Sequence, residues 1–120
     1  MFVKKISDCE EFIANDGCLL REIMHPENDP VELSYSIAIA SVEVGKQTYR
    51  HRLKQTEVYY ILTGQGHMHV GDESQDVTAG DGILIPAKAV QWIENTGDRP
   101  LQFIAIVSPP WREEDDERLE

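Results

Sequence analysis

Apolar and polar residues alternate with a period of two along much of the chain. Leu33, Tyr35, Ile37 and Ile39 alternate with small residues, and this pattern predicts a strand with one well-buried face. Further strands are predicted at residues 48–53, 57–62, 67–70, 75–78, 82–85, 90–94 and 101–107. Gly, Asn and Asp residues separate these segments, and none has a convincing amphipathic helical period. Short, evenly spaced strands with such turns are typical of an all-β barrel or sandwich.

The two ends of the chain lack this alternation. Residues 1–30 are irregular, with a helical turn predicted at residues 8–13 and Pro-containing loops near residue 30. Residues 113–117 are all acidic, which favours a solvated tail. We therefore expect one domain over residues 1–120, with a barrel core at about 31–108, an N-terminal arm at 1–30 and an acidic C-terminal tail at 111–120.

Composition narrows the functional classes. The 120 residues fit one domain, and 41% of them are hydrophobic, which is ordinary for a globular chain. Twenty-two acidic and eleven basic side chains give a net charge of −11, which argues against nucleic acid or an anionic membrane as a partner. No apolar signal segment or membrane span is visible, so free, reduced thiols at Cys9 and Cys18 and a cytoplasmic location are expected.

Two spaced groups of residues carry the candidate chemistry. The first comprises Gly45, His51, Leu53, Glu57 and Gly64, and the second comprises Gly80, Pro86, Lys88, Gln91 and Asn95. Together they resemble the bipartite signature of the cupin superfamily, over roughly residues 31–108. The resemblance implies a double-stranded β-helix, also called a jelly-roll barrel, that is often a homodimer built by strand exchange or sheet packing. It also implies a metal ion held by two histidines and a glutamate from the first group and a histidine from the second.

This chain departs from the cupin pattern at its metal positions. His51 and Glu57 match it, whereas Leu53 and Gln91 stand where histidines are expected. The resemblance therefore implies a degenerate site in which His51, Glu57 and Gln91 hold a divalent metal, with Zn, Ni, Mn and Fe(II) all chemically suitable. The alternative is a site without metal, in which Gln91 hydrogen-bonds to Glu57 and the cavity still binds a small molecule.

Strand periodicity predicts which side chains accompany this set. Residues two apart share a face, so His51 groups with Tyr49, and Glu57 groups with Tyr59. Either tyrosine is thus a candidate polar neighbour in the barrel mouth. His67 and His69 form a tempting pair, but the apolar residues between and after them predict that both histidines face outward.

Three further residues have competing interpretations. Trp92 neighbours Gln91 and should face away from the pocket, where a core or interface role is favoured over ligand stacking. Trp111 follows two prolines and can pin the C-terminal segment onto the barrel. Lys88 occupies a motif position where glycine is expected, and an exposed loop lysine is favoured over a cation at the pocket lip.

One favoured function and two alternatives follow from these residues. The favoured one is an isomerase or lyase in which the metal polarises a small carbonyl, carboxylate or sugar-like compound while Glu57 or Tyr59 moves a proton. The alternatives are a metal-free small-molecule binding module without catalysis and a cupin dioxygenase, the latter weakened by the missing second histidine. A structural protein that uses its acidic tail as a contact has no support beyond charge.

Overall fold

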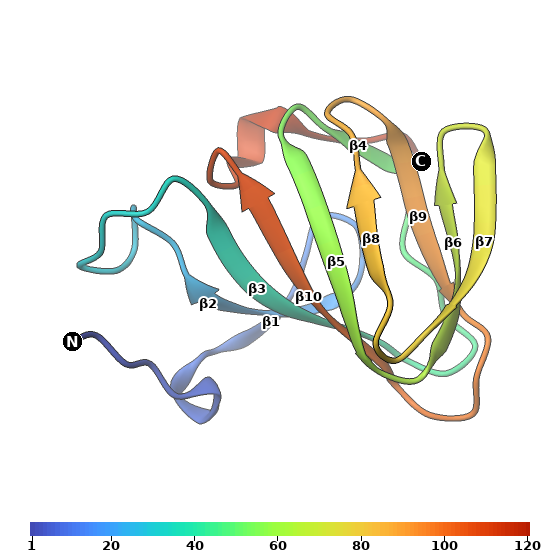
Figure 1. Cartoon of the computed structure of the whole chain (residues 1–120), viewed down its shortest axis with the longest axis horizontal. Coiled ribbons are helices and arrows are strands. Elements are labelled where there is room, and N and C mark those ends of the chain that lie inside the picture. Colours follow the sequence, from blue (N-terminus) through green and yellow to red (C-terminus); the bar gives the residue numbers. More distant parts are fainter.

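Two antiparallel sheets form the protein in the computed structural model, which describes residues 1–120 (Figure 1). The six-stranded sheet has the order β1 (Glu11–Ile13), β2 (Leu19–Met24), β3 (Ser36–Val42), β10 (Leu101–Ser108), β5 (Thr56–Thr63) and β8 (Gly82–Ile85). The five-stranded sheet has the order β11 (Asp116–Arg118), β4 (His51–Leu53), β9 (Val90–Asn95), β6 (Gln65–Val70) and β7 (Glu73–Thr78). The only helical pieces are the 3₁₀ turns η1 (Ile6–Asp8) and η2 (Glu113–Asp115). The expected all-β jelly roll is confirmed.

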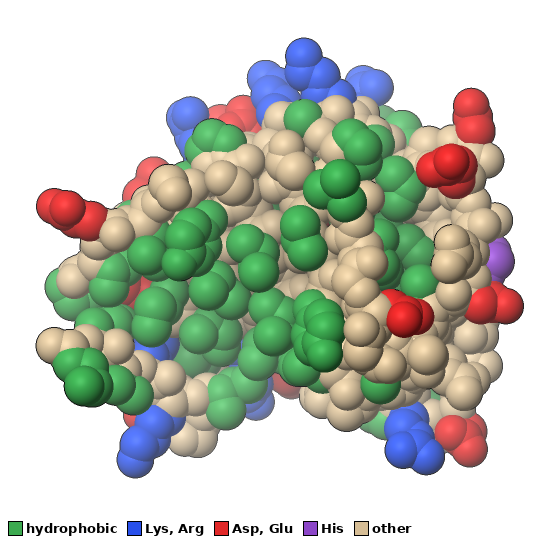
Figure 2. Space-filling model, viewed as in Figure 1, with side chains coloured by type: hydrophobic (Ala, Val, Ile, Leu, Met, Phe, Trp, Pro, Cys, Tyr) green, Lys and Arg blue, Asp and Glu red, His purple; other side chains and the backbone are tan.

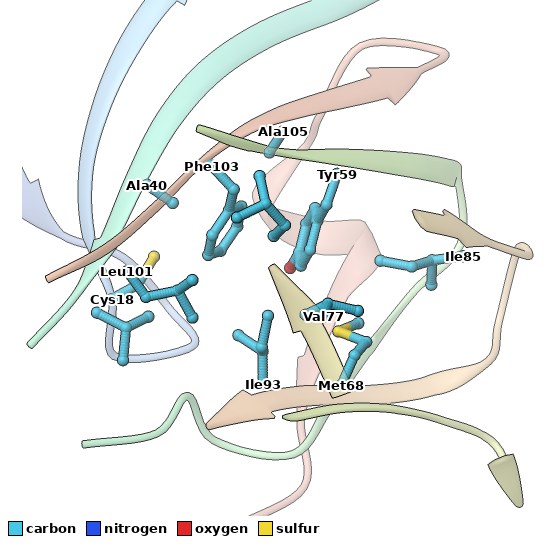
Figure 3. Close-up of a cluster of buried hydrophobic side chains, with 12 residues drawn as sticks. Cys18, Ala40, Tyr59, Met68, Val77, Ile85, Ile93, Leu101, Phe103 and Ala105 are labelled. Atoms are coloured by element: carbon cyan, nitrogen blue, oxygen red, sulfur yellow. The ribbon is translucent and has the colours of Figure 1, made fainter. Parts of the chain in front are cut away.

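The hydrophobic core lies between the sheets. Phe103 and Ile85 from one sheet meet Met68 and Ile93 from the other, and all four are buried (Figure 3). The ring of Tyr59 packs against Phe103 with 4.2 Å between the ring centroids. Because side chains alternate across each strand, the residues between these positions face outward. The barrel therefore encloses one core, and its polar site must lie at the edge of that core.

The expected orientation of β3 is wrong. The strand begins at Ser36, and its inward residues are the small ones, including Ala40, whereas Ile37 and Ile39 are only half-buried. Ala40 pairs with Phe103 across the sheet, so a small inward residue lies beside a large ring. The small side chains leave room for an internal cavity, which Ser36, Ala38 and Ala40 line.

Both chain ends belong to the sheets. The helical turn expected at residues 8–13 is wrong: the 3₁₀ turn η1 ends at Asp8, and residues 11–13 form the strand β1. The next strand, β2, pairs with β3. At the other end, β11 pairs with β4. The expectation of a solvated acidic tail is wrong for Asp115, which accepts a hydrogen bond of 2.8 Å from Gln55 Nε2, and for Asp116, which lines the cavity. Both ends of the chain are therefore held in the sheets by strands that lie far away in the sequence.

Neither helical turn is long or apolar enough to span a membrane. Cys9 and Cys18 are both buried free thiols, as expected.

Candidate functional site

A cavity of about 100 Å³ opens at one end of the barrel. Twelve of its eighteen lining residues are hydrophobic, among them Leu53 and Phe103. The remaining six are Asp16, Glu22, Ser36, His51, Glu57 and Asp116. No lysine or arginine lines it. The cavity thus has an apolar body and a group of polar side chains that are mostly acidic.

A chain of hydrogen bonds runs from Tyr59 through Gln91 to Glu57. The Tyr59 hydroxyl donates to Gln91 Oε1 over 3.0 Å, and Gln91 Nε2 donates to Glu57 Oε1 over 3.0 Å. Tyr59 and Glu57 lie two residues apart on β5 and so share its inner face, while Gln91 reaches them from β9. Gln91 is fully buried and does not line the cavity. The Gln91 amide therefore contacts Glu57 from the side that faces away from the cavity.

Burial makes Glu57 an unusually weak acid. Removal from water raises the pKa of Glu57 from 4.5 to about 8, the Gln91 hydrogen bond partly opposes this rise, and Asp16 and Asp116 reinforce it. Glu57 is 7% exposed, lines the cavity, and has no protein partner for Oε2. A carboxyl group in this state carries a proton at neutral pH and can donate it into the cavity.

Burial also raises the pKa of Tyr59 well above its usual value, and the charge of Glu57 adds to that effect. The phenol therefore keeps its proton and remains a donor to Gln91. Of the two tyrosines expected near the site, only Tyr59 is there. Tyr49 is 41% exposed, and its ring lies beneath the Arg118 guanidinium, whose Cζ is 3.8 Å from the ring centroid.

His51 lines the cavity from β4, where it is paired in register with Gln91. Its Nδ1 lies 2.9 Å from the carbonyl oxygen of Tyr49. A carbonyl oxygen only accepts, so Nδ1 carries the proton, and Nε2 of the neutral ring is an acceptor. Asp16 Oδ2 lies 3.8 Å from Nε2. That distance is too long for a hydrogen bond.

The structure adds residues that the sequence did not indicate. Asp16 lies in the turn between β1 and β2, where its Oδ1 accepts the Cys18 backbone N–H over 3.1 Å. Cys18 also lines the cavity, and burial, followed by the charge of Asp16, raises the pKa of its thiol. Asp116 enters from β11. All three lie outside the two motif groups, so no local signal identified them.

Trp111 fixes the segment that carries Asp116. Its indole Nε1 donates to Asp116 Oδ2 over 3.0 Å, its backbone N–H donates to Ser36 Oγ over 3.0 Å, and its carbonyl oxygen accepts from His25 Nε2 over 2.7 Å. These contacts agree with the expectation that Trp111 pins the C-terminal segment. Asp116 Oδ1 is buried and has no hydrogen-bond partner.

The donors expected for a metal do not form a suitable set in this arrangement. Both ends of the Gln91 amide are occupied by Tyr59 and Glu57, and Leu53 supplies only hydrocarbon. No group of three or more His, Cys, Asp or Glu side chains has a geometry that fits a metal ion. His51, Glu57 and Gln91 are thus brought together, but not as a coordination shell.

The remaining candidates lie outside the cavity. His67 contacts Asp76 at 2.7 Å, and His69 stacks on Trp92 with 4.0 Å between ring centroids. Met68, between the two histidines, is buried in the core, as the alternation predicted. Lys88 is exposed and has a φ of 71°, a backbone conformation that favours the glycine of the motif.

Comparison with known proteins gives consistent results. Residues 38–107 match the cupin domain family. The uncharacterized protein MJ1618 of Methanocaldococcus jannaschii is 41% identical over 110 residues, which are 91% of this chain and 87% of that protein.

Solved structures agree with this assignment of the fold. The oxalate decarboxylase of Lactobacillus farciminis in complex with formate superposes with a TM-score of 0.82 at 24% identity, over 94% of this chain and 34% of that chain. This chain therefore spans about a third of the length of that enzyme. Streptomyces PAC13 with uridine superposes with a TM-score of 0.80 at 19% identity, over 100% of this chain and 91% of that chain. At these identities the two structures support the fold alone.

Proposed function

Since the chain belongs to the cupin family, we propose that it binds a small organic molecule in its cavity and exchanges a proton with it through Glu57. The main support for this proposal is the buried carboxyl of Glu57, which has a pKa of about 8 and lines the cavity. Related barrels described with formate and with uridine support a small-molecule ligand. Acid–base catalysis is most efficient when the pKa of the group lies near the working pH.

The proposed chemistry uses Glu57 in both protonation states. Neutral Glu57 donates its proton to a carbonyl or leaving hydroxyl oxygen of the ligand, and the resulting carboxylate accepts a proton from a neighbouring carbon. This order of steps gives an isomerisation or an elimination, so the activity is of the isomerase or lyase type. Tyr59 acts on Glu57 through Gln91 and is a positioning residue. A metal-dependent route, including a dioxygenase, requires donors that this site does not present as it stands.

A binding module without turnover is the second candidate. The mostly apolar wall of the cavity favours it, because such a wall binds a ligand without reacting with it. Both candidates require a bound small molecule, and they differ only in whether Glu57 changes it.

Ligand identification and a matched pair of variants separate these candidates. Molecules that co-purify with the protein are identified by mass spectrometry, and consumption of components of a small-molecule extract is then followed with the same readout. The Glu57→Gln variant preserves the shape of the side chain but has no acidic proton. We expect it to retain the ligand and to lose turnover by about 100-fold or more. Glu113→Gln, an exposed change outside the cavity, is the control.

Turnover that survives Glu57→Gln would contradict the proposed role of this carboxyl. A ligand that binds the wild type but is never consumed would favour the binding module.

We also propose that the chain forms a homodimer through the outer face of the six-stranded sheet. Ile104 pairs with Tyr60, and Ile106 pairs with Val58, which in turn pairs with Leu84. These side chains are half-buried or exposed, and Leu84 is 64% exposed. Figure 2 shows hydrophobic side chains gathered over the area where β3, β10 and β5 lie in Figure 1. A continuous uncharged face on a chain of net charge −11 is best explained by a contact with a second copy.

Light scattering after size-exclusion chromatography tests this assembly. The wild type should have the mass of a dimer, and Leu84→Glu should convert it to a monomer because a charge cannot be buried unpaired at the contact. Val44→Glu replaces another exposed apolar residue, in the turn after β3, and should leave the mass unchanged. A monomeric wild type would refute the proposal.

A further inference from the structure

Two acceptor atoms of buried side chains that line the cavity lie close together without a hydrogen bond between them. His51 Nε2 and Asp16 Oδ2 are 3.8 Å apart. The ring proton of His51 is on Nδ1, where it is used by the Tyr49 carbonyl oxygen. His51 is 4% exposed and Asp16 is 9% exposed, so bulk water does not easily satisfy either atom. Polar atoms of buried side chains normally have partners, and a bound molecule with N–H groups would supply donors to both.

A third acceptor lines the same cavity. Asp116 Oδ1 is buried and unpartnered, although the other oxygen of this carboxyl receives the Trp111 indole N–H. The Tyr59 hydroxyl is bound to Gln91, and the donors left in the lining include the protonated carboxyl of Glu57 and the weak thiol of Cys18. With no lysine or arginine in the lining, the polar end of the cavity has an excess of acceptors and of negative charge.

We infer that the cavity binds its ligand through a cationic amine, whose N–H groups donate to Asp16 and His51 and whose charge is complemented by Asp116. The inference rests on the proposed function, because it names the class of molecule that occupies the same cavity. A single ammonium has three donors and can contact two acceptors at this separation. Its hydrocarbon part would lie against Leu53 and Phe103.

The same geometry disfavours acids. A carboxylate ligand would add negative charge beside Asp16 and Asp116, with no basic side chain to compensate. This preference is the reverse of what formate in the related oxalate decarboxylase would suggest. The volume of about 100 Å³ limits the enclosed part of the ligand to about five or six non-hydrogen atoms, judged from larger cavities that hold benzene.

Three probes with one hydrocarbon body test the inference. Isobutylamine, isobutanol and isobutyrate differ in their head group, which is cationic, neutral or anionic at pH 7. Their dissociation constants are measured by ligand-observed NMR. We expect the amine to bind about tenfold or more tightly than isobutyrate, with the alcohol between them.

Two variants test whether Asp16 is the residue that binds the amine. Asp16→Asn removes the charge but keeps an oxygen that can accept the Cys18 N–H, so the turn should stay folded, as checked by circular dichroism. It should weaken isobutylamine about tenfold and change isobutanol less than about twofold. Glu113→Gln removes one exposed charge outside the cavity and should leave all three affinities unchanged.

Each other result has a definite meaning. Isobutanol that binds as tightly as the amine, or isobutyrate that binds more tightly, would overturn the inference and leave the proposed small-molecule cavity intact. A proton found on His51 Nε2 of the free protein by ¹⁵N NMR would also overturn it, since Asp16 would then have an internal partner. Failure of all three probes to bind at about 50 mM, far above the millimolar range of weak ligands, would overturn both the inference and the proposed function.

Discussion

Replacing Glu57 by glutamine should change how the stability of the protein depends on pH. The pKa of Glu57 is 4.5 in an ordinary environment and rises to about 8 in the folded protein, chiefly because of burial. Below pH 4.5 both the folded and the unfolded states carry the proton. Between pH 4.5 and pH 8 only the unfolded state loses it, so the free energy of unfolding falls as pH rises.

The size of the effect follows from the same two values. Each pH unit in this interval lowers the free energy of unfolding by about 1.4 kcal/mol. From pH 5 to pH 8 the contribution of Glu57 should therefore fall by about 4 kcal/mol. Glutamine has no proton to lose, and it can still accept the hydrogen bond from Gln91. The stability of Glu57→Gln relative to wild type should consequently rise by this amount across the interval.

Urea unfolding at pH 5, 6, 7 and 8, followed by tryptophan fluorescence, measures this difference. The control Glu113→Gln changes an exposed carboxyl and should follow the wild type within about 0.5 kcal/mol at every pH. Parallel profiles for Glu57→Gln and wild type would refute the reasoning, because they would mean that Glu57 ionises equally easily in both states.

Three other perturbations have definite expected outcomes. Gln91→Leu should lower the free energy of unfolding by about 2–4 kcal/mol in urea, because the Tyr59 hydroxyl and the Glu57 carboxyl each lose a partner. Gly66→Ala should cost about 3 kcal/mol or more in the same assay, because a Cβ there would lie 2.8 Å from the carbonyl oxygen of Glu94. Protein purified without chelator or added metal should contain less than about 0.1 metal ion per chain by elemental analysis, because the site lacks a coordinating set.

Each of these outcomes has a matched comparison. Gly82→Ala meets no atom within 4 Å, and it should stay within about 0.5 kcal/mol of wild type. A Gln91→Leu variant as stable as wild type would show that the Tyr59–Gln91–Glu57 chain contributes no stability. Metal at one equivalent, lost in His51→Ala, would show that Glu57 and Gln91 rearrange around an ion.

The inner face of the motif strands was predictable from sequence because its signals are local. Glycine turns separate the strands, and the period of two places Glu57 beside Tyr59 and His51 beside Leu53. The structure brings these residues together at the cavity. The role of Gln91 was open between a metal ligand and a partner of Glu57, and the observed hydrogen bond is the one named in the second alternative.

The rest of the site depends on long-range pairing. Asp16 reaches the cavity because β2 pairs with β3, and Asp116 reaches it because β11 pairs with β4. Neither pairing leaves a periodic signal in the segment concerned. The acidic run suggested only solvent exposure, because most such runs are solvated. The prediction of which face of β3 is buried was wrong for a different reason. The outer face of the sheet is also apolar, so hydrophobicity alone could not identify the inner face.

The two departures from the cupin motif have a joint consequence. A histidine set around a metal would place a positive charge beside Glu57 and keep it ionised. With Leu53 and Gln91 in those positions, the charges that act on Glu57 are those of Asp16 and Asp116, and burial raises the pKa of Glu57 to about 8. The Gln91 hydrogen bond favours the carboxylate, but it is too weak to outweigh the loss of water. The same substitutions that disfavour a coordination shell therefore create a carboxyl group able to exchange a proton near neutral pH, in a cavity whose free acceptors favour a cationic ligand.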